Sequence, residues 1–441
     1  MFKLWDRRAQ CLLSLKRLEE AKLAFDKAVK YSSLAKLDKK KREKFLKDVN
    51  VGLQKIEDQQ STVVEEQNIP SEAGSQSDDI LTVTSPHPQF PSASSSLQVR
   101  YQRGRGRYVE AGEDIPVGTT LLRESPITWA LHPDRFGTHC QECLGQVKSV
   151  IPCDECTAVC FCSVTCRDTA VSSYHQYECR ANNIIIASGL NIYPAITLRL
   201  LTRFGLDHVW SLRESLENHD DTAGANTDTL YTGDDFINAF NLVSHEDKMT
   251  EEEHLLRTFV SVFLLKLLQF NNYFGNFDED ETFQELSEKE EFIGTLLLHF
   301  SNSLPQNIHD IALLETSEVR RWVNSAEIKS LGAGVYLTAA LFNHSCDPSF
   351  MRCNVGKSLV SVTNKNIGQG EEVSECYGQM YYSKSVETRQ EQLRKHYKFD
   401  CECVACYYNY PTIKELKYAC GGAVTKHQDL MRIRYCSKIN D

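Results

Sequence analysis

The sequence has no excess of basic residues and no long hydrophobic run. Its 441 residues include 49 Lys and Arg against 60 Asp and Glu, a formal net charge of -11. Direct nucleic-acid binding is not expected, because no long-range positive field draws the chain onto phosphates, and a protein substrate fits better. The most apolar segment, residues 255–270, contains Arg257 and Lys266 and is shorter than the roughly 20 apolar residues that span a bilayer. It predicts a buried helix, and no membrane association is expected.

A secretory signal is also missing. The first residues, MFKLWDRR, contain neither an uninterrupted apolar core nor a cleavage site, so export is not expected. The 17 cysteines are many for a chain that is not exported. Their odd number and the repeated Cys-x-x-Cys pairs fit metal ligation better than a disulfide framework. We therefore expect a reducing compartment, the cytoplasm or the nucleus.

Residues 1–57 carry helical patterns. Apolar and small residues recur at helical spacing from Arg8 to Tyr31, and a polar break at Lys16 and Arg17 predicts two antiparallel helices. A third, highly charged helix is predicted to continue from residue 32 to the end of this segment.

The second half of this hairpin resembles a tetratricopeptide (TPR) repeat, because Ala21, Phe25 and Ala28 stand where such repeats place small and aromatic residues. A plain helical hairpin is the alternative. A single repeat cannot bury its own face, so the chain is expected to begin inside a longer array. Residues 58–97 are rich in Ser, Gln, Pro and Asp and predict a disordered linker at a domain boundary.

The remaining chain alternates β-rich and helical segments around two cysteine clusters. Short β-rich runs and turn signals predict strands over 98–139, and residues 180–330 predict a mainly helical insertion with an acidic stretch near 278–291. Strands are predicted again at 359–363 and 372–377, before an amphipathic helix and the second cluster. The predicted order is therefore β, zinc, α, β, zinc.

The first cluster, residues 140–179, contains eight ligand-type residues in four closely spaced pairs. Two tetrahedral zinc sites need that number of thiolate and imidazole ligands, and closed sites of this kind are structural. Scattered buried cysteines are the alternative, which the regular spacing disfavours. The block resembles a MYND zinc finger in its full Cys/His order. By that resemblance the pairs interleave, so that one ion is held by Cys140, Cys143, Cys162 and Cys166 and the other by Cys153, Cys156, His175 and Cys179.

The most informative stretch is Asn343-His344-Ser345-Cys346-Asp347-Pro348, within the predicted core at 331–380. Alone it would be an ordinary polar turn, but Asn-His-Ser-Cys-x-Pro is a signature of SET methyltransferases. Three more features follow the family order: the early Gly-Arg-Gly turn at 104–106, the segment 371–378, and the Cys-x-Cys-x-x-Cys cluster at 401–406.

Taken together, the chain resembles SMYD-type (SET and MYND) protein-lysine methyltransferases over roughly residues 99–410, in the branch with TPR-like repeats ahead of the SET domain. The resemblance implies an α+β fold: a SET β-fold with an inserted MYND finger and helical insertion, and a cysteine-rich post-SET segment at 381–410. The short polar tail at 411–441 departs from longer family members, so a fragment or shortened form is expected.

The resemblance also implies use of S-adenosylmethionine to methylate lysine on a histone or non-histone protein. Tyr377 matches the catalytic tyrosine, and a structural role for its buried hydroxyl is the alternative. Val243 and His245 stand where some family members carry polar cofactor contacts, which puts those contacts in doubt. The residues that the resemblance places at the cofactor are Arg103, Gly104, Arg105, Asn307, Asn343, His344, Tyr377 and Phe399.

A third zinc ion is implied by the same resemblance, held by Cys346, Cys401, Cys403 and Cys406, which would fix Phe399 over the cofactor. The MYND finger and the TPR-like helices are expected to bind peptides of partner proteins. A non-catalytic adaptor that keeps the SET fold as a scaffold is therefore the alternative function. No metal is assigned to the remaining cysteines, which are Cys11, Cys160, Cys353, Cys376, Cys420 and Cys436.

Overall fold

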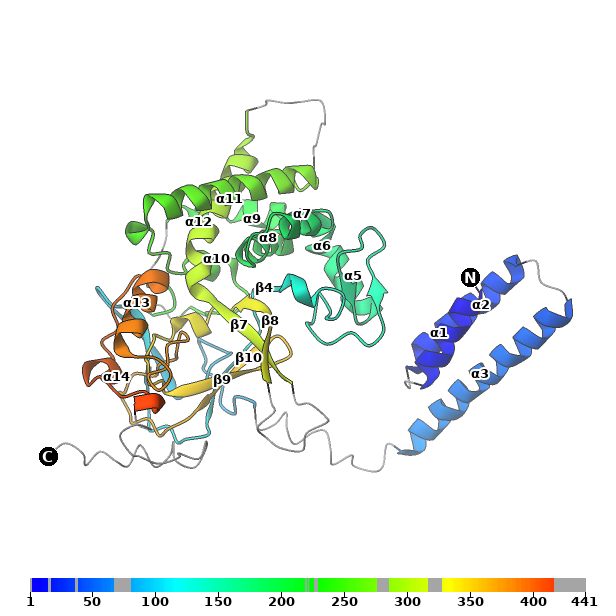
Figure 1. The fold of residues 1–441 in the computed structure, drawn as a ribbon, viewed down its shortest axis with the longest axis horizontal. Coiled ribbons are helices and arrows are strands. Elements are labelled where there is room, and N and C mark those ends of the chain that lie inside the picture. The colour runs from blue at the N-terminus through cyan, green and yellow to red at the C-terminus, as the bar shows by residue number, and fades with distance from the viewer. Residues whose placement is uncertain are drawn as a thin grey trace. The chain divides into compact units, whose positions relative to one another are not determined.

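The computed structural model describes residues 2–14, 17–35, 39–66, 81–218, 220, 222–225, 229–275, 285–315 and 327–415. The chain forms two compact units, Met1–Asp79 and Ile80–Asp441, and both are drawn in Figure 1. The division between them falls inside the linker predicted at 58–97. From residue 416 onward, the predicted tail lies outside the described residues.

In the first unit three helices surround a small apolar core. Ala21 and Phe25 are fully buried together with Ala9 and Val49, and a Cβ on Gly52 would lie 2.3 Å from the Phe25 ring. Two helices lie where the hairpin was predicted, and the third extends past the predicted end at residue 57. The helices are α1 (Phe2–Ser14), α2 (Leu18–Leu34) and α3 (Lys39–Glu66).

The β-structure of the second unit joins strands that are far apart in the sequence. All of its ladders are antiparallel, with β1 next to β2, β10 between β3 and β9, and β8 between β4 and β7. Gly332 of β8 is needed there, because a Cβ on it would lie 2.0 Å from the carbonyl oxygen of Ala130. The strands are β1 (Leu97–Gln102), β2 (Gly106–Ala111), β3 (Thr120–Glu124), β4 (Thr128–Leu131), β7 (Ile308–Glu315), β8 (Glu327–Val335), β9 (Phe350–Val355) and β10 (Ser358–Thr363).

The cysteine block and a helical layer occupy the sequence between β4 and β7. The block contains the short strands β5 (Ile151–Pro152) and β6 (Cys160–Phe161) and the helices α5 (Val164–Ser172) and α6 (His175–Glu178). In Figure 1 the helical layer covers one side of the strands, with α11 beside α12. Its helices are α7 (Ala181–Ala187), α8 (Tyr193–Phe204), α9 (Leu206–Ser211), α10 (Phe236–Phe240), α11 (Glu251–Phe270) and α12 (Glu288–Asn307), and α13 (Val386–Tyr397) and α14 (Val404–Tyr407) follow the last strand.

A buried ion pair connects the cysteine block to the sheet. Arg199 of α8 and Glu178 of α6 lie 2.5 Å apart, with side chains only 1% and 3% exposed. Arg199 also donates a hydrogen bond to the carbonyl oxygen of Trp129 in β4 at 2.9 Å. Three separate elements therefore meet at one guanidinium group.

The structure corrects the expectation that residues 58–97 form a disordered linker throughout. Helix α3 continues to Glu66, and residues 81–96 form turns that pack against the rest of the second unit ahead of β1. Ala93 bridges to Leu122 of β3, and Phe90 is buried against the ring of Tyr231. Burial of a few apolar side chains is enough to keep residues 81–96 packed against the second unit's core, although the composition of the segment is polar overall.

The predicted secondary structure also differs at two later places. Helix does not extend to residue 330, because α12 ends at Asn307 and is followed by β7 and β8. Short apolar runs such as 308–314 do not by themselves distinguish a strand from a buried helix. Residues 372–377 form two isolated bridges, Glu110 with Glu372 and His344 with Glu375, in place of a regular strand.

The helix predicted to be buried at 255–270 is buried on one face only. This helix, α11, begins with a capping box in which Thr250 and Glu253 satisfy each other's backbone N–H groups. Leu264 and Leu268 are buried, whereas Leu255 and Phe259 are 58% and 65% exposed. None of the described helices is both long enough and apolar enough to cross a membrane.

Candidate active site and metal centres

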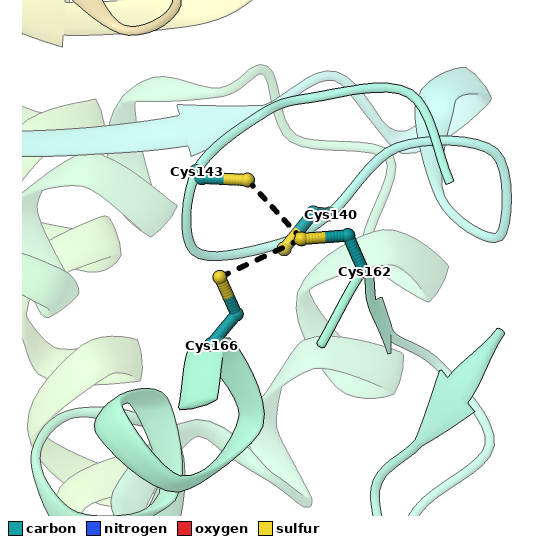
Figure 2. Close-up of side chains that lie close together, drawn as sticks. All are labelled: Cys140, Cys143, Cys162 and Cys166. Atoms are coloured by element: carbon teal, nitrogen blue, oxygen red, sulfur yellow. Dashed lines mark hydrogen bonds between the residues drawn. The ribbon is translucent and has the colours of Figure 1, made fainter. Parts of the chain in front are cut away.

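The first cysteine cluster brings together four residues from two parts of the block. Figure 2 shows Cys140, Cys143, Cys162 and Cys166 with their sulfur atoms directed at a common point. The Cys143 and Cys162 sulfurs are 3.5 Å apart, and those of Cys162 and Cys166 are 3.6 Å apart. Four sulfurs around one zinc at 2.3 Å would be about 3.8 Å from one another. The donor set and spacing therefore fit a tetrahedral zinc ion.

The second cluster contains Cys153, Cys156, His175 and Cys179, whose ligand atoms all lie within 4.8 Å of one another. The Nε2 atom of His175 is 3.6 Å from the Cys156 sulfur. Burial, and then the charge of Arg199, lower the pKa of His175 to about 4. A neutral imidazole is the form that binds a metal, so this histidine fits a zinc ligand. The two clusters interleave in the sequence as the MYND resemblance implied.

The third cluster joins the core to the segment after it. Cys346 lies with Cys401, Cys403 and Cys406, again with all sulfurs within 4.8 Å. The Cys346 N–H donates to the Cys403 sulfur at 3.4 Å. Arg389 of α13 is fully buried and donates to the Cys406 sulfur at 3.6 Å. This all-thiolate set fits zinc and ties the second half of the segment predicted at 381–410 to Cys346 in the core.

The unassigned cysteines lie apart from these clusters. Cys160 donates to the carbonyl oxygen of His139, Cys376 is half-buried, and Cys11 and Cys353 are exposed. Cys420 and Cys436 lie outside the described residues.

Two chain segments cross at the predicted active site. The Glu375 N–H donates to the Asn343 carbonyl at 2.9 Å, and the Ser345 N–H donates to the Glu375 carbonyl at 2.7 Å. The Tyr377 N–H donates to Nδ1 of His344 at 3.0 Å. Burial lowers the pKa of His344 to about 4, so its Nδ1 is free of a proton and accepts this bond. The crossing fixes His344 and Tyr377 relative to each other.

Aromatic rings gather around this crossing. The ring centroid of Tyr377 lies 5.1 Å from that of His344, 6.4 Å from that of Phe399 and 4.8 Å from that of Tyr397. Phe399 follows directly after Lys398, which takes a left-handed conformation at the end of α13. Sequence reasoning missed Tyr397, although its position two residues before Phe399 was a signal.

The hydroxyl group of Tyr377 is oriented by the backbone. It donates a hydrogen bond to the carbonyl oxygen of Phe342 at 2.9 Å. Burial, and then the charge of Glu375, raise the pKa of Tyr377 well above its usual value. The phenol therefore keeps its proton at neutral pH, and its oxygen can still accept a hydrogen bond from another group.

The Gly-Arg-Gly turn connects β1 and β2 close to the same crossing. Gly104 and Gly106 have φ values of +84° and +81°, a backbone conformation that residues with a side chain rarely adopt. A Cβ atom on either glycine would meet nothing within 4 Å. Arg103 is exposed on this turn. Arg105 forms an ion pair with Glu372, and Glu372 accepts a hydrogen bond from the Asn343 amide at 3.3 Å. Glu372 thus links the turn to Asn343.

Asn307 is the last residue of α12 and directly precedes β7. Its amide nitrogen donates to the carbonyl oxygens of Val243 and Ser303, at 2.9 and 2.7 Å. Both of its N–H groups are therefore used within the protein, and the side-chain oxygen is the atom that a ligand could meet. His245, two residues after Val243, takes a left-handed conformation with φ of 49°.

A buried acid–base pair beneath the crossing was not predicted. Glu375 lies 3.2 Å from Nε2 of His309 and 3.4 Å from the Arg352 guanidinium. Burial raises the pKa of Glu375, but these two partners outweigh it and lower the pKa below its usual value. No sequence signal joined Glu375 to His309, because the pair is separated by 66 residues.

Comparisons with known proteins agree with this geometry. The family model for the SET domain matches residues 106–378. The chain is 22% identical over 463 residues to "Protein-lysine N-methyltransferase SMYD4" of Pongo abelii, covering 92% of this chain and 57% of that protein. It is 26% identical over 302 residues to "Histone-lysine N-methyltransferase SMYD3" of Homo sapiens, covering 68% and 59%.

A SET and MYND domain-containing protein of Dictyostelium discoideum is 27% identical over 326 residues, covering 68% of this chain and 58% of that protein. The chain thus spans somewhat more than half the length of the curated relatives that it matches.

Proposed function

Because the chain belongs to the SET domain family and is of the SMYD type, we propose that it is a protein-lysine N-methyltransferase that uses S-adenosylmethionine. The observation that carries the proposal is the crossing of the segment that holds Asn343 and His344 with the segment that ends at Tyr377. The printed names of the relatives and the aromatic rings around Tyr377 support an enzyme over the adaptor alternative.

Tyr377 is the catalytic residue of this proposal. Its O–H group donates a hydrogen bond to the Phe342 carbonyl, so its oxygen is left to accept a hydrogen bond from the substrate amine. The lone pair of the amine is then directed at the methyl group, and positioning of this kind accounts for much of a transfer reaction's acceleration. The rings of His344, Phe399 and Tyr397 exclude water around the reacting atoms.

The cofactor, when bound, supplies an electrophilic methyl group on a sulfonium ion. Asn343 and His344 would contact its amino-acid and adenosine parts, and Phe399 would stack on the adenine. The turn that holds Arg103, Gly104 and Arg105 would lie beside it, and Asn307 would contribute its side-chain oxygen. The Arg105–Glu372–Asn343 chain of contacts supports this grouping, because it already joins the turn to the central motif.

Three zinc ions per chain complete the proposal, one in each cysteine cluster. The third ion would be held by Cys346, Cys401, Cys403 and Cys406, and because Cys401 follows Phe399 by two residues, this cluster would keep Phe399 near the crossing. The first two hold the MYND-like block, which with the TPR-like helices binds peptides of partner proteins. The substrate is a histone or non-histone protein, in the cytoplasm or the nucleus.

Methyl transfer from labelled S-adenosylmethionine tests the function. The zinc-loaded chain is incubated with a cell extract and the labelled cofactor, and labelled proteins are digested and identified. Label on a lysine side chain is expected. Absence of labelled lysine, from protein that binds the cofactor in calorimetry, would contradict the activity while leaving the cofactor site in place.

A further inference from the structure

Helix α11 presents an apolar stripe on the side away from its neighbours. Its other side packs on α12 and α8, where Ser261, Leu264 and Leu268 are buried, and Figure 1 shows α11 at the outer edge of the helical layer. Exposed large apolar patches of this kind commonly mark interaction sites. The exposed large apolar side chains of α11 are Leu255 (58%), Leu256 (59%), Phe259 (65%), Val262 (51%) and Phe270 (45%).

The stripe has the spacing of a helix-pairing surface. Glu252, Leu255, Phe259, Val262 and Lys266 are all exposed and follow one another at alternating intervals of three and four residues. This is the spacing of the contact positions in a two-stranded coiled coil. Leu255, Phe259 and Val262 are flanked by an acid on the N-terminal side and a base on the C-terminal side, and Phe270, 45% exposed, stands four residues beyond Lys266 at the end of the helix.

These end charges complement the stripe of a second copy. Glu252 and Lys266 are each seven residues from Phe259, about 10 Å along the helix axis on either side. In an antiparallel pair related by a two-fold axis at Phe259, each Glu252 faces the Lys266 of the other copy. A parallel pair would instead place like charges together.

We propose that α11 forms a two-fold symmetric antiparallel pair with α11 of a second copy of this chain. The contact is isologous, so each favourable charge pair occurs twice. Phe259 lies on the axis, and Leu255 and Val262 fill the space on both sides of it. A 20-residue helix is about 30 Å long, so the contact area is modest and the dimer dissociates on dilution.

Sedimentation velocity of the full zinc-loaded chain over a dilution series tests the pairing. The wild-type chain is expected to shift from one mass to twice that mass with rising concentration. Glu252→Lys and Lys266→Glu should each raise the dissociation constant by about tenfold, because two pairs turn repulsive at once. The double variant Glu252→Lys/Lys266→Glu should return to within about twofold of wild type, because attraction is restored with reversed signs.

Phe259→Asp should abolish the dimer, since it would bury two like charges on the axis. Val117→Asp, a change of the same kind at another exposed apolar residue, should leave the dimer intact. Thermal unfolding and zinc content check that each variant is folded. The variants Glu252→Lys and Lys266→Glu test the same contact without changing its apolar residues. A wild-type chain that stays monomeric, or a double variant that fails to recover, would overturn the proposal, as would a dimer indifferent to both charge reversals.

Discussion

Glu375 contributes to the proposed active site through its backbone, through its buried carboxylate and through the effect of its charge on Tyr377. Its backbone is hydrogen-bonded to Asn343 and Ser345 on the crossing segment. Its buried carboxylate is held by His309 and Arg352, and its charge helps to keep Tyr377 protonated. A buried carboxylate is tolerated only when it is paired in this way. The pair therefore fixes the geometry on which Tyr377 depends.

Asn343→Ala is expected to weaken S-adenosylmethionine binding without unfolding the protein. The residue is half-buried, and its amide makes one long hydrogen bond to Glu372, so little packing is lost. A missing hydrogen bond to a ligand costs about 1–3 kcal/mol, or roughly fivefold to 150-fold in affinity. Calorimetric titration measures it, with Asn366→Ala as the matched control. Unchanged affinity would assign Asn343 a structural role.

The pH dependence of methyl transfer should show no loss of activity from ionisation of Tyr377. Its pKa is raised well above the usual value, so the hydroxyl stays protonated through pH of about 10, where an ordinary tyrosine ionises. The rate should rise with pH as the substrate lysine loses its proton. A rate that falls with an apparent pKa near 10, in protein shown to remain folded, would contradict the assigned state of Tyr377.

At the scale of elements, the Arg199–Glu178 pair couples α8 to the helix that carries His175. Arg199→Met should destabilise the protein by about 3–5 kcal/mol, because it leaves the Glu178 carboxylate buried without its partner. It should also weaken retention of the second zinc ion, since Glu178 and His175 share α6. Chemical unfolding and metal release measure both effects. Arg180→Met, at an exposed arginine in the same region, should change neither by a comparable amount.

Elements were predictable from sequence where the pattern was local. The early strands and the strand at 359–363 carry clear β-rich runs between turns, and they are present as β1 to β4 and β10. The strand β7 was missed because its short apolar run follows a helix without a break. Exposure of one face of α11 was also missed, because residues 255–270 are apolar on more than one side.

At the scale of the whole molecule, three zinc ions should be present in each chain. Elemental analysis is expected to find three for the wild type, and fewer for Cys166→Ser, which removes one ligand of the first cluster. Cys353→Ser, at an exposed cysteine outside the clusters, should retain all three. Chelation should unfold at least the cysteine block, because structural zinc contributes folding free energy directly. One ion or none in the wild type would contradict the assignment.

Much of the site could be predicted because its motifs are contiguous. The zinc ligand sets and the Asn343–Pro348 signature are read from spacing and family order. Their three-dimensional grouping agrees with that interpretation for the clusters, for His344 with Tyr377 and for Phe399. Contacts between distant segments could not be predicted, because one sequence does not show which buried carboxylate meets which imidazole. The partnership of Glu375 with His309 and that of Glu372 with Arg105 are of this kind.

The most direct measurement of the central claim is the turnover of the Tyr377→Phe variant on a protein that the wild-type chain methylates. The hydroxyl is lost and the ring remains, so folding, zinc content and cofactor affinity should be preserved. Turnover should fall by about 10² to 10³, as for the loss of one preorganised hydrogen-bonding group in a transition state. Tyr408→Phe, the same change at an exposed tyrosine, should methylate at the wild-type rate. A folded Tyr377→Phe variant that also methylates at the wild-type rate would contradict the account.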